Sequence, residues 1–292
     1  MTSAYTTLWK PGASQKLFIF GVSTNSYLTL REFDTSIPNN TQLGPATDPT
    51  SVPSTGLIIP DTSIAAISYG GLTRVFGFIA TKASDGTQQT SLYQLSPVWQ
   101  AVKAGTSKTK STAAVAGKMT DGEVGYVYYI EVVGKVIEQS LTWKNPYIVQ
   151  NQQLHKATYL AACLTEKGGR FIAYQLDTKY IEVYDVSGKH PCGQLVGTGN
   201  AKESTPLAIV SYSKVGENKS YINVYWQQTG TDKLWRSQSE DNGSNWTDKI
   251  LSNADSPDGS SISAIFDGVA QKVVLTYLYS AQDIKCWDDE VV

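Results

Sequence analysis

The fold is decided by two segments that follow one another closely: a small apolar one, Ser63-Ile64-Ala65-Ala66-Ile67-Ser68-Tyr69, and a bulky one that runs from Arg74 to Ala80. Segments of both kinds recur along the chain, and each pair is followed by a third segment of mixed composition. The bulky segments begin at residues 16, 74, 126, 170, 223 and 272. Short β-rich segments that repeat about every 50 residues, with turn residues between them, are typical of β-propeller blades.

No segment has a sustained helical period, so we predict an all-β chain. The prediction is a six-bladed β-propeller whose blades have three to four antiparallel strands, with residues 1–292 forming one domain. The expected blades are residues 1–60, 61–110, 111–157, 158–203, 204–258 and 259–292. The sixth is short, so its outer strand is expected to be missing or to be supplied by Met1 to Ala4. The proline-rich stretch 34–60 is expected to be a long loop, either a surface connector or a rim over a pocket.

The composition excludes several classes of protein. Hydrophobic residues make up 41% and charged residues 17% of the 292 residues, which suits neither a disordered chain nor a membrane-spanning one. The net charge of −2 gives no reason to expect a nucleic-acid partner. The N-terminus lacks the basic start and apolar run of a secretory signal, so we expect a cytoplasmic protein without membrane insertion. Three widely spaced cysteines, Cys163, Cys192 and Cys286, are expected to be reduced thiols.

Residue sets for conventional catalysis are scarce. The two histidines, His155 and His190, have no metal-ligand spacing, and no phosphate-binding loop or nucleophile elbow occurs. We therefore predict no cofactor and no metal. Aromatic residues are plentiful, and most tryptophans of a propeller pack between blades. Four tryptophans at or after the end of a third segment are expected to reach a surface groove: Trp99, Trp143, Trp246 and Trp287.

The run Tyr221-Ile222-Asn223-Val224-Tyr225-Trp226-Gln227, with Lys233-Leu234-Trp235-Arg236 and Asn245-Trp246 after it, resembles a blade of the fungal fucose-specific lectins. The resemblance covers nearly the whole chain. It implies sugar pockets between the blades, each with an arginine that opens the second strand, a glutamate twelve residues later on the third strand, and a tryptophan soon after. The two charged groups hold sugar hydroxyls, and the aromatic ring stacks on the sugar.

Arg170 and Glu182 alone keep both charged residues at this spacing, and His190 stands where the tryptophan is expected. The other five blades lack the arginine, the glutamate or both. Lys16 and Lys272 stand in the arginine position of the first and sixth blades, with no glutamate after them. The pairs found in the arginine and glutamate positions of the second, third and fifth blades are Arg74 with Gln94, Tyr126 with Glu138, and Asn223 with Arg236. At most one sugar pocket is therefore expected to survive. A carbohydrate-binding lectin with degenerate sites is one hypothesis, and a propeller for protein interaction is another.

The same architecture occurs in the fungal hetero-Diels–Alderases of tropolonic sesquiterpenoid biosynthesis, and the chain resembles that group overall. The resemblance implies a cofactor-free pericyclase of secondary metabolism that joins a tropolone-type o-quinone methide to a humulene-type sesquiterpene alkene. The implied partners are small apolar molecules, and a homodimer is possible by analogy with the lectins.

Such a cycloaddition needs two partners held in one orientation, a donor at the quinone methide oxygen, and walls that exclude water. The candidate donors are Arg74, Tyr126, Asn223 and Arg236. For each of them, an ordinary hydrogen bond at the surface or between blades is at least as good an interpretation. The candidate substrate-binding residues are Tyr69, Trp99, Trp143, Trp226, Trp246, Arg170 and Glu182.

Overall fold

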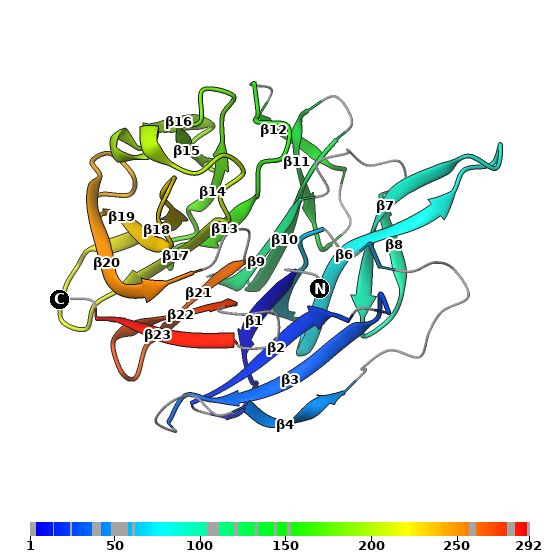
Figure 1. Cartoon of the computed structure of the whole chain (residues 1–292), viewed down its shortest axis with the longest axis horizontal. Coiled ribbons are helices and arrows are strands. Elements are labelled where there is room, and N and C mark those ends of the chain that lie inside the picture. The colour runs from blue at the N-terminus through cyan, green and yellow to red at the C-terminus, as the bar shows by residue number, and fades with distance from the viewer. Residues whose placement is uncertain are drawn as a thin grey trace.

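Six antiparallel β-sheets surround a central axis, and each is built from one continuous stretch of chain (Figure 1). The computed structural model describes residues 4–13, 15–23, 25–36, 42–47, 58–59, 62–103, 111–119, 122–131, 134–142, 145–150, 153–256, 261–278 and 284–290. This arrangement confirms the predicted all-β, six-bladed propeller. Within the described residues, the single helical segment is the short η1 (Val196–Asn200), and no helix has the length and apolar character to cross a membrane.

The strands of each blade run outward from the axis in chain order. Blade I holds β1 (Tyr5–Trp9), β2 (Lys16–Val22), β3 (Leu28–Asp34) and β4 (Gln42–Thr47), and blade II holds β5 (Ala65–Tyr69), β6 (Leu72–Lys82), β7 (Gln88–Ser96) and β8 (Gln100–Lys103). Blade III holds β9 (Thr112–Met119), β10 (Gly122–Ile130), β11 (Val136–Ser140) and β12 (Tyr147–Gln150), and blade IV holds β13 (Ala161–Leu164), β14 (Arg170–Gln175), β15 (Ile181–Asp185) and β16 (His190–Gln194). Blade V holds β17 (Ala208–Ser213), β18 (Ser220–Gln227), β19 (Lys233–Ser239) and β20 (Thr247–Asp255), and blade VI holds β21 (Ile262–Asp267), β22 (Lys272–Leu278) and β23 (Ile284–Glu290).

Small residues on the inner strands let six sheets crowd around the axis. The inner strands contact one another in the order β1, β5, β9, β13, β17, β21 and back to β1. They line an axial cavity of about 760 Å³, with the open space at its mouths included. Alanines contribute to this lining from five blades: Ala65, Ala113, Ala161, Ala208 and Ala264.

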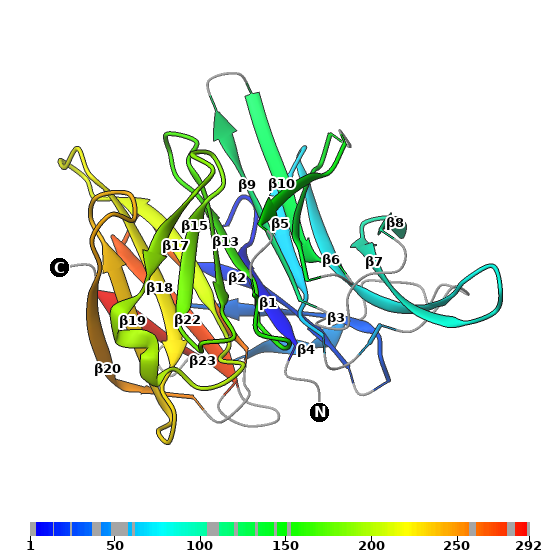
Figure 2. The ribbon, with the colours of Figure 1, turned by 90° about the horizontal axis from the view of Figure 1, so that it is seen from above.

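Each blade packs against both neighbours, and every interface has its own hydrophobic cluster. The side chains of a strand point alternately to its two faces, so a second strand serves two clusters. In β10, Val127 and Tyr129 pack toward blade II, whereas Tyr126 and Tyr128 pack toward blade IV. Burial on both faces explains why the second segments read as almost continuous apolar runs. Figure 2 shows neighbouring blades packed side by side when the propeller is seen from above.

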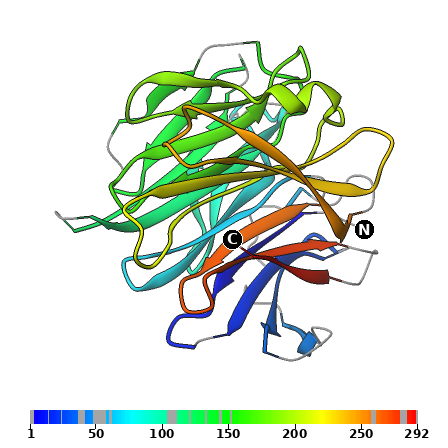
Figure 3. The same cartoon turned by 90° about the vertical axis from the view of Figure 1, so that its left-hand side faces the viewer.

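Side chains close the ring between the last and the first blade, which lie side by side in Figure 3. The Tyr5 hydroxyl lies within hydrogen-bond distance of two carbonyl oxygens, that of Ser261 at 2.8 Å and that of Thr276, and these two acceptors share its one proton. The Trp9 Nε1 atom donates to the carbonyl oxygen of Phe266 at 2.9 Å. These contacts join blades I and VI although the two blades share no strand in the described part of the chain.

Two details of the expected organisation are corrected or lie outside the described residues. Ala4 does not join blade VI, because it packs into the cluster between blades I and II, and residues 1–3 are not described. The stretch 34–60 is not wholly a loop, because β4 lies within it as the outer strand of blade I. Pro45 is tolerated there because an edge strand can forgo one backbone donor. Ile58 then bridges to Ile79 and is almost fully buried.

Candidate functional site

The first residue of each bulky second segment of the sequence is here termed the opening residue. It begins the second strand in blades I, IV and VI, and it lies two to four residues after the start of that strand in blades II, III and V. The side chain of Arg170, the opening residue of blade IV, points back toward blade III, because it shares a face with Ile172 of the cluster between blades III and IV. The other opening residues share a face with side chains that pack against the following blade: Lys16, Arg74, Tyr126, Asn223 and Lys272.

A shift of one residue in strand register explains why Arg170 points backward. The inner-strand residue Ala113 pairs with Tyr128 in blade III, whereas Ala161 pairs with Ala173 in blade IV. Phe171 thus takes the position that corresponds to Tyr126, and Arg170 comes one residue earlier. Because side chains alternate along a strand, this step sends Arg170 to the opposite face. The groove between blades III and IV therefore receives the opening residues of both blades.

The III–IV groove combines a carboxylate, a cation and an aromatic ring. Arg170 Nε donates to Glu138 Oε2 at 2.9 Å, and the Tyr128 hydroxyl donates to the same oxygen at 2.6 Å. The Arg170 guanidinium lies over the Tyr126 ring, 4.7 Å from its centroid. Glu138 is 7% exposed, whereas the Arg170 side chain is 24% exposed. The buried carboxylate thus fixes a cation whose outer nitrogen atoms can reach a ligand.

Burial and the charges in this groove hold Tyr128 and Arg170 each in one protonation state. Burial, reinforced by the Glu138 charge, raises the pKa of Tyr128 well above its ordinary value, so this hydroxyl stays a donor. Burial acts to lower the pKa of Arg170, but Glu138 and two neighbouring tyrosines raise it, and the net pKa lies above the ordinary value. Arg170 therefore remains a cation at any physiological pH.

Glu182 faces the same groove but lies too far along the strand to pair with Arg170. It stands opposite Tyr174 in the β14–β15 register and accepts a hydrogen bond from the Tyr174 hydroxyl. Tyr174 lies four positions after Arg170, which amounts to about 13 Å along an extended strand. The spacing of twelve residues therefore does not bring the two charged groups together, and Glu138 of the neighbouring blade takes the place of Glu182.

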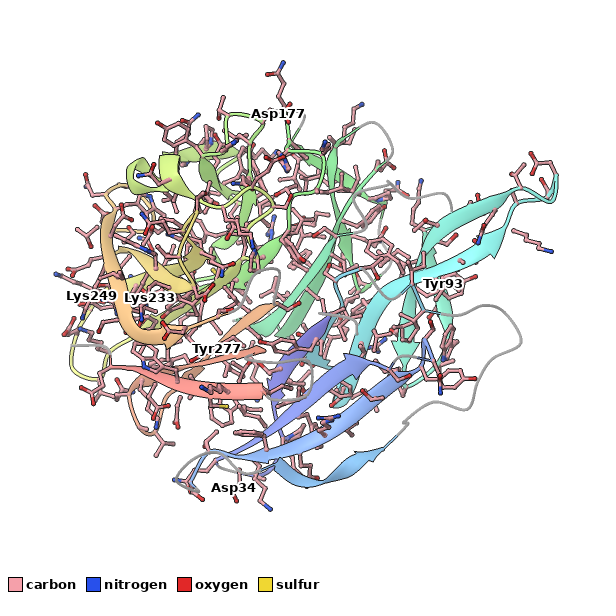
Figure 4. All side chains as sticks on the ribbon, in the orientation of Figure 1. Asp34, Tyr93, Asp177, Lys233, Lys249 and Tyr277 are labelled. Atoms are coloured by element: carbon pink, nitrogen blue, oxygen red, sulfur yellow. The ribbon has the colours of Figure 1, made fainter. Side chains whose placement is uncertain are left out.

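Asn223 and Arg236 lie in the core between blades V and VI. Arg236 Nη1 donates to both carboxylate oxygens of Asp289, at 2.9 and 2.8 Å, and the Tyr225 hydroxyl donates to Asp289 Oδ2 at 2.8 Å. Asn223 Nδ2 donates to the Tyr225 hydroxyl at 3.0 Å. All four residues are buried, so this network fills the interface with the chain's own groups. Tyr277, which Figure 4 labels, belongs to the hydrophobic cluster of the same interface.

Of the predicted aromatic walls, Trp226 and Trp246 belong to the interface between blades IV and V. Trp226 is 1% exposed, stacks on Trp235 and donates from Nε1 to the Ser237 hydroxyl at 3.1 Å. Trp246 is partly buried, packs against the same cluster as Cys192, and donates to the carbonyl oxygen of Gly243. No opening residue points into this interface, and a cluster of buried apolar side chains from both blades occupies it.

Trp99 and Tyr69 lie in two further interfaces. Trp99 packs on the cluster between blades I and II, with its ring centroid 6.3 Å from that of Tyr93. Figure 4 labels Tyr93. Tyr69 packs on the cluster between blades II and III, under Arg74. Trp143 lies outside the described residues. The predicted site residues are thus spread over five interfaces, and the III–IV groove alone brings together Tyr126, Arg170 and a carboxylate.

Four partners in these networks were not among the predicted site residues: Tyr128, Glu138, Tyr225 and Asp289. Tyr128 could have been found from the β10–β11 hairpin, which places it opposite Glu138. An unusual arginine at position 236 signals a buried acid nearby, but no local pattern points to Asp289, 53 residues later. Across the described ranges, no three His, Cys, Asp or Glu side chains come close enough to hold a metal ion.

Comparison with known proteins supports the fold and no closer relationship. No protein-family model matches the chain, and no curated protein matches it. Among solved structures, the fungal lectin of Aleuria aurantia, a six-bladed β-propeller, aligns with a TM-score of 0.60 at 15% identity, covering 98% of this chain and 95% of the lectin. AofleA from Arthrobotrys oligospora aligns with a TM-score of 0.62 at 11% identity, covering 99% and 86% of the two chains. The BP39L lectin from Burkholderia pseudomallei gives 0.62 at 14% identity, covering 97% and 80%. The chain therefore shares the lectin-like propeller fold over its whole length.

Proposed function

We propose that the chain is a cofactor-free pericyclase, a hetero-Diels–Alderase that joins a tropolone-type o-quinone methide to a humulene-type sesquiterpene alkene. In this reaction the oxygen and the exocyclic carbon of the quinone methide add across the alkene. One C–O bond and one C–C bond form, no atom leaves, and no electron carrier takes part. The protein has to orient two small molecules, stabilise charge on one oxygen and keep water away.

The observation that carries the proposal is the unequal filling of the grooves between blades. The V–VI interface is closed by the Arg236–Asp289 pair, and the IV–V interface is packed with Trp226 and its neighbours. The III–IV groove receives two opening residues and keeps a partly exposed cation. A lectin gains avidity from several equivalent sites, which such a distribution does not provide. One differentiated groove suits an enzyme that holds one pair of substrates.

Within the III–IV groove, the outer N–H groups of Arg170 and the Tyr126 hydroxyl are the donors for the quinone methide oxygen. Arg170 is fixed through Nε by Glu138, so its guanidinium needs little reorganisation when charge develops on the substrate. The Tyr126 ring, with Tyr184 packed deeper in the same cluster, provides an apolar surface beside that oxygen.

The second candidate function is carbohydrate binding in the same groove. Its support is chemical: Arg170, Glu138 and Tyr126 supply the cation, the carboxylate and the ring with which proteins hold a sugar. A mutant form of the Aleuria aurantia lectin and the lectin SapL1 were both solved with an α-methyl fucoside. Methyl fucoside is therefore the ligand with which to test this alternative.

The test is to incubate the protein with a quinone methide precursor and humulenol, and to measure the rate of adduct formation and its enantiomeric excess. We expect both to exceed the protein-free control, and we expect Arg170→Gln to lower the rate at least about tenfold. Lys219→Gln, which removes an exposed cation from a distant surface pair, is the matched control. A rate and an enantiomeric excess equal to the control would refute the pericyclase. Agglutination that free fucose inhibits would establish the lectin instead.

A further inference from the structure

A second arginine, Arg74 in the groove between blades II and III, is held in one orientation by neutral groups. Its Nη1 atom donates to Gln94 Oε1 at 2.8 Å, and its Nε atom lies 3.4 Å from the carbonyl oxygen of Tyr69. Gln94 is 3% exposed and is itself fixed through Nε2 to the carbonyl oxygen of Val98. The guanidinium lies over the Tyr69 ring, 5.4 Å from its centroid. The cation is thus preorganised before any ligand arrives.

Arg74 is partly exposed, and the hydrogen bonds described for it leave several of its N–H donors unused. Arginine has five N–H donors, and the contacts to Tyr69 and Gln94 use two of them. The free donors on Nη1 and Nη2 lie side by side, which is the geometry that binds a carboxylate through two parallel hydrogen bonds. Next to them the chain turns through Gly70 and Gly71, both in the left-handed region with φ of 63° and 71°. A Cβ atom at Gly71 would meet no atom within 4 Å, and one at Gly70 would meet Arg74 Nη2 first, at 3.9 Å. These two glycines, here termed the glycine rim, therefore place no side chain over the donors.

The charge of this groove differs from that of the III–IV groove. Arg170 is neutralised by Glu138, but Arg74 contacts the uncharged Gln94, and within the described ranges it forms no ion pair with an acid. A neutral partner fixes the geometry of a guanidinium without cancelling its charge. The free edge therefore attracts an anion more strongly than it attracts a neutral hydroxyl.

We infer that the II–III groove is a binding site for a flat organic anion, with its carboxylate or enolate oxygens on the free edge of Arg74 and its ring against the glycine rim. This site is separate from the III–IV groove and does not depend on the proposed reaction. A neutral polyol lacks the charge that the groove selects for. The Tyr69 ring supports the guanidinium from below, so a planar ligand can continue the plane of the guanidinium outward.

One acidic residue sets the affinity that this site can reach. Glu123 of blade III accepts a hydrogen bond from the Gly70 amide at 2.7 Å, so its carboxylate stands at the rim. It is exposed and does not contact the guanidinium, but its charge repels an incoming anion. Removal of that charge should therefore tighten anion binding, whereas removal of the Arg74 charge should weaken it.

The experiment is an NMR titration of benzoate, followed on the ligand's own signals, with benzamide as the uncharged analogue. We expect benzoate to bind at least about tenfold more tightly than benzamide, which corresponds to about 1.4 kcal/mol. Arg74→Gln should weaken benzoate binding at least about tenfold, and Arg74→Lys, which keeps the charge but not the forked donors, should fall between. Glu123→Gln should tighten it, and Lys219→Gln should leave it within about twofold. Circular dichroism of each variant checks that the propeller is intact.

Three results would overturn the inference. They are equal affinity for benzoate and benzamide, equal effects of Arg74→Gln and Lys219→Gln, and no benzoate binding at concentrations up to about 50 mM, which is weaker than any useful site. If Arg74→Gln fails to fold, the comparison of Arg74→Lys with Glu123→Gln decides, because the inference requires their effects to have opposite signs. None of these outcomes depends on whether the protein catalyses a cycloaddition.

Discussion

Arg170 and Glu138 come from neighbouring blades, and the Nε atom of the first lies 2.9 Å from Oε2 of the second. The same carboxylate oxygen accepts the Tyr128 hydroxyl, so one buried acid organises donors from β10 and β14. This contact makes the III–IV groove different from the other grooves, and it links the stability of the interface to the geometry of the proposed site.

We predict that Glu138→Gln lowers the free energy of unfolding by about 1–3 kcal/mol. The change leaves Arg170 in a half-buried position without its counter-charge, and the partial exposure of Arg170 keeps the cost below that of a fully buried pair. Urea denaturation measures the effect. Glu240→Gln, which breaks an exposed pair with Lys219, is the control and should cost less than about 1 kcal/mol. Equal losses in the two variants would mean that the III–IV pair has no special role.

The burial of Trp226 predicts a structural role for this side chain. Trp226→Ala should lower the free energy of unfolding by about 3–5 kcal/mol, because it empties a large volume between blades IV and V. Tyr147→Ala, at a side chain that is 41% exposed, should change it by less than about 1 kcal/mol. Thermal unfolding of both variants checks the prediction. A small loss at Trp226 would place this residue at a surface and contradict the packing described above.

The ring closure predicts a local effect of Tyr5→Phe. The variant keeps the ring but removes the hydroxyl whose proton the carbonyl oxygens of Ser261 and Thr276 share, and we expect a loss of about 1–2 kcal/mol. Hydrogen exchange should accelerate in β1 and β21 first, because these strands meet at the closure. Thr62→Val, which removes a buried hydroxyl within one blade connection, is the comparison. Uniform acceleration across all blades would show that the closure is not the weakest interface.

Burial of the thiols predicts a loss of stability in alkali. Burial raises the pKa of Cys163 to about 12 and that of Cys192 to about 11 from the ordinary value of 9.0. A group with a raised pKa in the folded state favours folding fully below its unfolded pKa, and this contribution declines as the pH rises toward the folded pKa. The free energy of unfolding should therefore fall between pH 9 and pH 11. Cys163→Ala should flatten this decline, and an unchanged profile in the variant would contradict the assignment to this thiol.

The fold could be predicted because it depends on a repeat, whereas the site depends on register. Alanine-rich inner segments and bulky second segments recur in order, and each blade forms from adjacent residues. The direction in which the Arg170 side chain points, however, depends on the pairing of β13 with β14, which is shifted by one residue relative to the pairing of β9 with β10 in blade III. Neither the composition nor the spacing of the segments reveals such a shift. The pairing of Arg236 with Asp289 similarly depends on the contact between two blades, which a search within one blade does not find. Burial on both faces of β18 likewise decides that Trp226 is core.

The central claim is that one groove, between blades III and IV, binds the substrates of the proposed cycloaddition. The most direct measurement is isothermal titration calorimetry with the cycloadduct of the proposed reaction. The account predicts one binding site per chain, lost in Arg170→Gln and retained in Lys219→Gln. Several equivalent sites per chain, or a single site that Arg170→Gln leaves unchanged, would contradict it.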